Sequence, residues 1–168
     1  MRISIRIRQN KFYGRRKNKT YYKSLKQQLE HDFRLEDMDE GYIENPDQED
    51  ANIYIGGGDR PKEDWVEYIT GRAEVNWLKA SLDYKKHWGQ KMHPKTNEII
   101  TGLFNYSEHF QIPDPDLVVN ALGHFLKKKF GNCLHLAWHA DEHGTDQAGH
   151  FHFSLLNYDF RTHKTIGR

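Results

Sequence analysis

The stretch HLAWHADEHGTDQAGHFHFSLLN, residues 135–157, indicates the architecture of the chain. Its two ends alternate between apolar residues and histidines, which is the period-2 pattern of β-strands, and a polar segment containing glycines joins them. If the two strands pair, the apolar side chains line a core and the histidines meet on the opposite face. Directly opposed residues have Cβ atoms about 4.5–5.5 Å apart, so imidazoles from both strands can reach one ion.

The predicted histidine face indicates a metal site. It combines His139 from the first strand with His150 and His152 from the second, and Glu142, at the end of the first strand, can add an oxygen ligand. Such a set suits Mn²⁺, Zn²⁺, Co²⁺ or Ni²⁺ better than Mg²⁺, which prefers oxygen ligands. Three histidines with open coordination positions are typical of catalytic rather than structural sites. The alternative interpretation is a set of ordinary histidines on a solvent-facing strand.

Length and composition favour one ordered domain over residues 1–168. The single cysteine, Cys133, excludes an internal disulfide and fits a reducing cytoplasm. No apolar run is long enough to cross a bilayer, and the N-terminus lacks the apolar core of a signal peptide. We therefore expect a cytoplasmic protein without a membrane segment.

The net charge of +1 conceals an uneven distribution. From Arg2 to Lys26 there are ten Lys or Arg residues and no acidic residue, whereas acidic residues dominate from Glu30 to Asp64. A concentrated basic block favours binding to phosphate groups. The alternative is a solvated charged face or a flexible basic loop.

The segment SLKQQLEHDFR, residues 24–34, is expected to form a helix. Ser24, followed by Gln27, is a capping-box pattern, and apolar residues recur every four positions along one face. The same spacing predicts that His31 and Arg34 lie on the opposite, solvent-side face.

A second helix is expected over residues 114–131, with acids at its start, three lysines near its end and Gly131 after its last turn. Its predicted apolar stripe consists of Leu117, Val118, Ala121, Leu122, Phe125 and Leu126.

The remaining elements complete an α+β pattern. Strands are expected within residues 2–8 and 52–55, and a helix within residues 59–72. Residues 73–84 are ambiguous, and we favour a strand that begins near Val75. Strands interspersed with helices predict an antiparallel sheet with helices packed on it, and a metal site on two adjacent strands.

Two motifs in the histidine stretch resemble a known signature. HADE, residues 139–142, followed by HFH, residues 150–152, resembles the His-x-Asp-Glu and His-x-His motifs of HUH endonucleases, specifically the Mob/Pre (MOBV-type) plasmid mobilisation relaxases. The resemblance implies a relaxase fold derived from the ferredoxin-like fold. It implies that the metal residues are His139, Glu142, His150 and His152.

Two further segments are similar to the family in the same order. HDFR, residues 31–34, resembles the His-x-x-Arg motif, and NPDQEDANIY, residues 45–54, resembles an Asn-Pro…Asn segment that implies a place for Asn52 near the site. The sequence departs from the pattern in a longer gap between Glu142 and His150 and in Gly149, where the family has proline. Family members also continue beyond the equivalent of Arg168, so a truncated or unusually small domain is expected.

The resemblance implies metal-dependent nicking of one DNA strand at a plasmid transfer origin. The reaction is a transesterification that leaves a 5′-phosphoryl group on the protein and a free 3′-hydroxyl. The implied cofactor is Mn²⁺, with Mg²⁺, Zn²⁺, Co²⁺ or Ni²⁺ as alternatives. The implied partners are single-stranded origin DNA and other mobilisation or conjugation proteins, and the implied location is the bacterial cytoplasm. Alternative functions are a rolling-circle replication or transposition nuclease, and a non-catalytic DNA-binding or metal-binding module.

Two residues compete as nucleophile. His31 is the first choice, because a neutral imidazole is nucleophilic near pH 7 without a separate base. Arg34 is then placed to pair with the phosphate. Tyr22 is the second choice, and its phenol needs the metal or nearby Lys and Arg cations to ionise. Packing or base stacking is the alternative role for Tyr21 and Tyr22.

The basic block supplies candidate contacts to the DNA backbone. They are Arg6, Arg8, Arg15, Arg16, Lys17 and Lys19, with Tyr13, Tyr21 and Trp88 as stacking platforms, and with Arg161, Lys164 and Arg168 as a second basic group.

Overall fold

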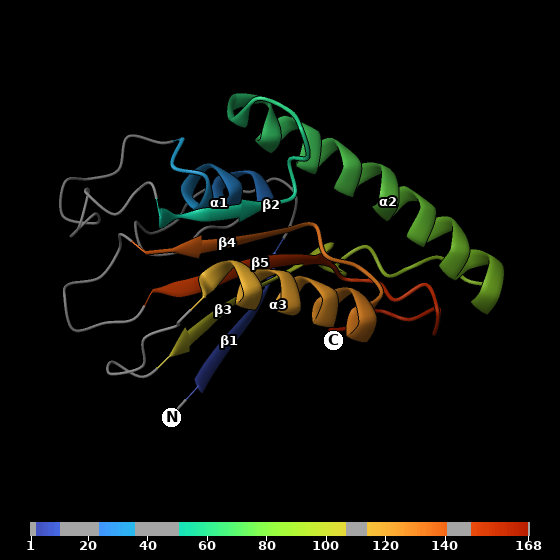
Figure 1. Ribbon diagram of the computed structural model, residues 1–168. Coiled ribbons are helices and arrows are strands. Elements are labelled where there is room, and N and C mark those ends of the chain that lie inside the picture. Colours follow the sequence, from blue (N-terminus) through green and yellow to red (C-terminus); the bar gives the residue numbers. More distant parts are fainter. Residues whose placement is uncertain (1–2, 11–23, 36–50, 107–113, 141–148, 168) are drawn as a thin grey trace.

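The computed structural model describes residues 3–10, 24–35, 51–106, 114–140 and 149–167, which form one antiparallel sheet and its helices (Figure 1). The strand order is β1 (Ile3–Asn10), β3 (Ile99–Tyr106), β5 (His150–Leu156), β4 (His135–His139) and β2 (Ile53–Ile55). Every neighbouring pair is antiparallel. The predicted α+β class is confirmed.

The helices cover both faces of the sheet. Helices α1 (Leu25–Asp32) and α2 (Trp65–Trp88) share one hydrophobic cluster with Ile99 and Leu156, whereas α3 (Pro115–Phe130) belongs to a second cluster. Successive side chains of a strand point to opposite faces, so each strand contributes to both clusters. The histidines predicted to share one face lie on the face of the sheet that α1 covers; they are His139, His150 and His152.

Strands β4 and β5 pair as predicted. His139 lies opposite His150, and His135 lies opposite Ser154. The intervening Trp138 and Phe151 pack in the α3-side cluster, with their ring centroids 4.5 Å apart. This register brings the histidines of both strands to one face.

Helix α1 begins at the predicted cap. The Ser24 hydroxyl accepts a hydrogen bond from the backbone N–H of Gln27 at 3.2 Å. The solvent-side prediction for His31 is wrong, because only 2% of this residue is exposed. The helix lies between α2 and the sheet, so Leu25 and Leu29 are buried in the cluster shared with α2 while His31 faces the sheet.

Helix α2 replaces the strand predicted near Val75. It runs for 24 residues and ends at Gly89, which adopts a left-handed conformation. Ala73 and Ala80 are fully buried on its inner side, whereas Val75 is 55% exposed. Burial at helical spacing therefore overrides the strand preference of a β-branched residue.

Helix α3 has the predicted ends. The Asp114 carboxylate accepts from the backbone N–H of Leu117 at 3.0 Å, and Gly131 adopts a left-handed conformation. The predicted apolar stripe is partly wrong, because Leu117 is 65% and Phe125 is 53% exposed. The sheet covers only part of the apolar face of α3. The side chains of this helix that are almost completely buried are therefore those of Val119 and Leu126. Within the described ranges, none of the helices combines the length and apolar character that a membrane span needs.

Candidate metal centre

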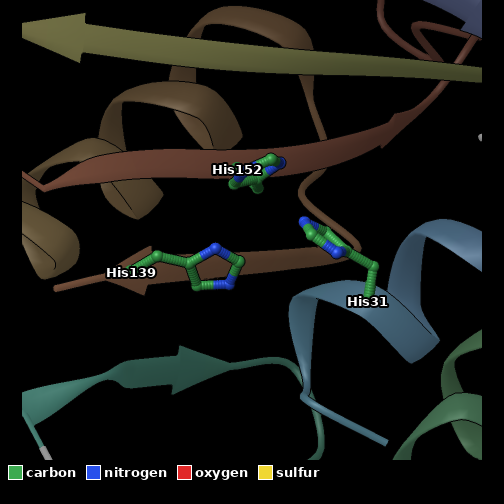
Figure 2. A group of neighbouring side chains, drawn as sticks. All are labelled: His31, His139 and His152. Carbon is green, nitrogen blue, oxygen red and sulfur yellow. The ribbon is translucent and has the colours of Figure 1, made fainter. Parts of the chain in front are cut away.

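Three histidines from separate elements converge on the α1 side of the sheet. His31 comes from α1, His139 from β4 and His152 from β5, and their rings lie around a common point in Figure 2. One ring nitrogen from each lies within 4.8 Å of the others. His31 and His139 are buried and His152 is nearly so. The three rings can therefore offer nitrogen ligands to one divalent cation.

His150 adjoins this group. Its Nε2 lies 2.8 Å from Nε2 of His152, and its ring centroid lies 5.4 Å from that of His139. Two nitrogen lone pairs repel at this distance, so a shared proton or a shared cation must hold them together. The structure thus brings His139, His150 and His152 together, while Glu142 lies outside the described residues.

Asp32 connects the histidines to one another, and sequence reasoning missed it. Its fully buried carboxylate accepts from Nε2 of His135 at 2.6 Å and from Nε2 of Gln28 at 2.6 Å. The same carboxylate lies 3.3 Å from Nδ1 of His152. The signal in the sequence is the acid that directly follows His31 in HDFR.

Hydrogen bonds to Asp32 also determine which nitrogens can bind a cation. Nε2 of His139 lies 2.9 Å from the backbone carbonyl oxygen of Asp32. A carbonyl can only accept, so this nitrogen carries the proton and Nδ1 of His139 carries the lone pair. Nδ1 of His152 lies near both the carboxylate, at 3.3 Å, and the amide nitrogen of Gln28, at 3.2 Å. In the tautomer in which Nδ1 donates to the carboxylate, Nε2 of His152 carries the lone pair. An outer carboxylate of this kind orients a metal-binding imidazole.

The charge states of the two central groups suit a metal site. Burial raises the pKa of Asp32, but attraction to His152, the hydrogen bond from His135 and the proximity of His31 outweigh it and hold the pKa well below its usual range. Burial lowers the pKa of His152 well below its ordinary value, although Asp32 opposes this. At neutral pH the carboxylate is therefore ionised and His152 is neutral, which is the form that binds metals.

Arg34 and Asn52 lie beside the histidines. Arg34 follows the end of α1 with a φ of 56°, and its guanidinium donates to the backbone carbonyl of His31 at 3.3 Å. The side-chain oxygen of Asn52 accepts from the backbone N–H of Ala140 at 2.7 Å. Asn52 therefore lies at the end of β4 that carries His139.

Gly149 makes a close approach at the same end of the hairpin. A Cβ atom at this position would overlap the backbone oxygen of His139 and the indole ring of Trp138. The local packing therefore requires a residue without a side chain at position 149.

Several of the remaining predicted DNA-binding residues either lie on β1, which is not adjacent to β4 or β5, or fall outside the described residues. The register pairs Arg6 with Leu103 and Arg8 with Thr101 on β3. The predicted residues outside the described ranges are Tyr13, Arg15, Arg16, Lys17, Lys19, Tyr21, Tyr22, Glu142 and Arg168.

Trp88 and Arg161 have structural partners. Arg161 donates to the backbone carbonyls of Lys128 and Lys129, both at 2.6 Å, and so caps the C-terminus of α3. Trp88 is the last residue of α2, whose C-terminal end extends away from α1 in Figure 1. Its indole N–H donates to the carbonyl of His163 at 2.6 Å. These contacts give both side chains a packing role.

Two solved structures share this arrangement of strands and helices. Both are Mn-bound crystal structures of the MobM relaxase domain (MOBV; Mob_Pre) with oriT DNA of plasmid pMV158. One has a TM-score of 0.64 at 11% identity, and the other a TM-score of 0.54 at 14% identity. Each alignment covers 98% of this chain and 74% of the relaxase domain.

The chain has the fold of a MOBV relaxase domain. The fold expected from the motifs is therefore confirmed. No protein-family model and no curated protein matches the sequence. At this low identity the likeness establishes the fold, and the chemistry must be argued from the residues.

Proposed function

We propose that this protein nicks one strand of DNA by metal-assisted transesterification, as a mobilisation relaxase. The observation that carries the proposal is the convergence of His31 from α1 with His139 and His152 from the sheet. The shared fold supports it, because the similar MobM domains are bound to origin DNA and to Mn.

The histidines fit a divalent cation by the chemistry of their donor atoms. His139 offers Nδ1, and His152 offers Nε2 in the tautomer that donates Nδ1 to Asp32. His150 lies beside them, and Glu142 follows β4 along the chain. We assign these four residues to a Mn²⁺ site, and we assign His31, whose ring nitrogen could also reach such a cation, to the attack on phosphorus instead. When bound, the cation neutralises charge that develops on the scissile phosphate.

His31 is our proposed nucleophile. Its ring centroid lies 5.6 Å from that of His139 and 5.5 Å from that of His152, so a phosphate at the centre would lie beside it. A ring nitrogen of His31 attacks phosphorus, a P–N bond forms and the bond from phosphorus to the 3′-oxygen breaks. The proton from the other ring nitrogen finally resides on the 3′-hydroxyl. The 5′-phosphoryl end of the strand then remains on the protein.

Neighbouring residues position the reactants. Arg34 has donors in addition to the one directed at the His31 carbonyl, and a guanidinium can bind two phosphate oxygens. The backbone of a single strand would follow the basic block, in which the six proposed contacts are Arg6, Arg8, Arg15, Arg16, Lys17 and Lys19. Origin DNA is thus the proposed partner, with other mobilisation or conjugation proteins assembling on the nicked complex.

The test is formation of a covalent protein–DNA adduct. The protein is incubated with Mn²⁺ and a labelled single-stranded oligonucleotide that spans the candidate origin, and products are separated on a denaturing gel. We expect a shifted band that requires Mn²⁺, disappears in His31→Ala and persists in Tyr22→Phe. His124→Ala is the matched control, because His124 is exposed on α3.

Each other outcome has a definite meaning. An adduct lost in Tyr22→Phe and kept in His31→Ala would make Tyr22 the nucleophile. DNA binding without any adduct would refute the enzymatic proposal and favour a non-catalytic module. An adduct with replication or transposon origins, and none with transfer origins, would favour the other HUH functions.

A further inference from the structure

Helix α2 carries an apolar stripe on the side that faces away from the core. The stripe consists of Val75, Leu78 and Leu82, each of which is more than half exposed. The inner side of the same helix buries Ala73 and Ala80. Val75 follows Ala73 by two residues, which is about 200° around a helix, so the stripe lies opposite the buried side. Single exposed apolar residues need no explanation, whereas three that line one helix face form a candidate contact surface.

The spacing of the stripe matches the seam of a two-stranded coiled coil. Leu78 follows Val75 by three residues and Leu82 follows Leu78 by four, which are the a, d and a positions of a heptad repeat. A β-branched residue at position a with leucine at position d favours two helices over three or four. The element that fits this stripe is therefore one further helix with the same spacing.

The charges beside the stripe indicate which helix this is. In the same heptads Glu74 occupies a g position and Lys79 occupies the following e position. In a parallel pair, position g of one helix lies beside the following e position of the other, so Glu74 of one copy would meet Lys79 of a second copy. The twofold symmetry of a homodimer would repeat this contact. An antiparallel pair would instead place g beside g and e beside e, which brings like charges together.

Both charged side chains are available for such a contact. Glu74 and Lys79 are five residues apart, whereas side chains of one helix pair at separations of three or four. Within the described part of the chain, neither makes an ion pair. Arg72, at the preceding e position, is already engaged, because its guanidinium donates to the backbone carbonyl of Leu134 at 2.8 Å. The charge contacts across the seam are therefore two copies of the Glu74–Lys79 pair.

The position of α2 leaves room for a second copy. Its C-terminal half extends away from α1 at the edge of the molecule (Figure 1). The sheet lies on the inner side of α2, where the helix shares a hydrophobic cluster with Ile99 and Leu156. A twofold axis parallel to α2 and beside the stripe would therefore place the two sheets on opposite sides of the helix pair.

We propose that the α2 stripe binds the same stripe of a second copy, so that two parallel α2 helices form the contact of a symmetric homodimer. Val75, Leu78 and Leu82 each meet their own counterpart, and Glu74 pairs with Lys79 of the other copy on both sides of the seam.

The proposal is tested by sedimentation equilibrium of the full chain without DNA or Mn²⁺. The wild type should show a concentration-dependent monomer–dimer equilibrium. Leu78→Ser should raise the dissociation constant by about 10-fold or more, because each dimer loses two central apolar side chains. Leu117→Ser is the matched control, since Leu117 is an equally exposed leucine on α3. It should dimerise as the wild type does.

A charge exchange tests the polar contact and remains informative if Leu78→Ser lowers the stability of the monomer. Glu74→Lys leaves lysine at both positions, and Lys79→Glu leaves glutamate at both, so each variant alone should dimerise about 10-fold more weakly. An equimolar mixture of the two should regain the dimer as a heterodimer, because each contact then joins opposite charges. A mixture that dimerises no better than either variant alone would overturn the proposed pairing.

Cross-linking tests the parallel orientation. Leu82→Cys should form a disulfide with its own counterpart under mild oxidation, because equivalent seam positions lie side by side in a parallel pair. Leu117→Cys is the control and should not cross-link at the same protein concentration. Preferential cross-linking of Val75→Cys to Leu82→Cys, rather than of either variant to itself, would overturn the parallel arrangement.

Two further results would overturn the homodimer itself. One is a wild type that stays monomeric up to about 1 mM, the weakest affinity that the proposal covers. The stripe would then belong to a contact with a helix of another protein. The other is a dimer that Leu78→Ser leaves unchanged, whether or not Leu117→Ser weakens it, because the copies would then meet through a different surface.

Discussion

Nε2 of His135 lies 2.6 Å from a carboxylate oxygen of Asp32, and both residues are fully buried. The contact joins β4 to the end of α1 across 103 residues of sequence. Because the carboxylate also contacts His152, it fixes the helix that carries His31 relative to the strands that carry the other histidines. Several measurable properties depend on this arrangement.

Asp32→Asn should weaken Mn²⁺ binding by about 10–100-fold, the usual effect of losing an outer carboxylate that orients a metal-binding imidazole. The neutral amide cannot hold His135 and His152 as strongly as the carboxylate does. Calorimetric titration with Mn²⁺ measures the change. Asp83→Asn is the control, because Asp83 also accepts from a histidine, His163, at 2.8 Å. Equal affinities of Asp32→Asn and wild type would contradict the proposed orienting role.

Acid should destabilise the metal-free protein in two pH windows. The pKa of His152 is lowered in the folded state, so the unfolded chain binds a proton first as pH falls below about 6.5. The pKa of Asp32 is also lowered in the folded state. The ionised carboxylate therefore stabilises the fold at pH values above the usual pKa of aspartate, and this stabilisation is lost as pH falls through and below that pKa. Each group should reduce the free energy of unfolding by at most about 1.4 kcal/mol per pH unit.

Urea titrations in EDTA between pH 7.5 and 5 test the first window. His152→Gln should show a shallower pH dependence than the wild type, since the substituted residue does not titrate. His124→Ala should retain the wild-type slope because His124 is exposed. A His152→Gln slope as steep as that of the wild type would refute the assignment to His152.

Gly149→Ala should destabilise the fold by about 1–3 kcal/mol, the usual cost of forcing an extra methyl into a packed site. The methyl group would meet the carbonyl of His139 and the ring of Trp138. Gly123→Ala should instead stabilise by about 0.5–1 kcal/mol, because it adds a better helix former in open space. Urea midpoints measure both changes, and a neutral Gly149→Ala would show that the hairpin relaxes easily.

Cys133 should react slowly with alkylating reagents. Burial raises the pKa of its thiol to about 11 from 9.0. Two pH units correspond to about 100-fold less thiolate at pH 8, and the thiolate is the reactive form. Iodoacetamide labelling followed by mass spectrometry measures the rate, with the protein in guanidinium chloride as the reference. Equal rates in the folded and unfolded protein would contradict the raised pKa of the thiol.

Local patterns were sufficient to predict much of the sheet and the helix ends. Alternation predicted the pairing of β4 with β5, because shifting a strand by one residue would expose its apolar side chains. Ser24, Asp114 and Gly131 were recognisable as helix caps because capping depends on residues within one turn.

Long-range packing accounts for what sequence reasoning missed. The helix over residues 73–84 depends on where Ala73 and Ala80 are buried, which the segment itself does not encode. The burial of His31 follows from α1 being covered on two sides. The role of Asp32 depends on His135 and His152, both more than 100 residues away along the chain.

That sequence separation has a consequence for biosynthesis. At about 5–20 residues per second, a ribosome needs roughly 5–20 s to translate from the codon for Asp32 to that for His135. Throughout this interval the nascent helix has neither β4 nor β5 to dock against, so the centre can assemble only late in translation or after release. Any property that requires the joined histidines therefore arises only after β4 and β5 have been made.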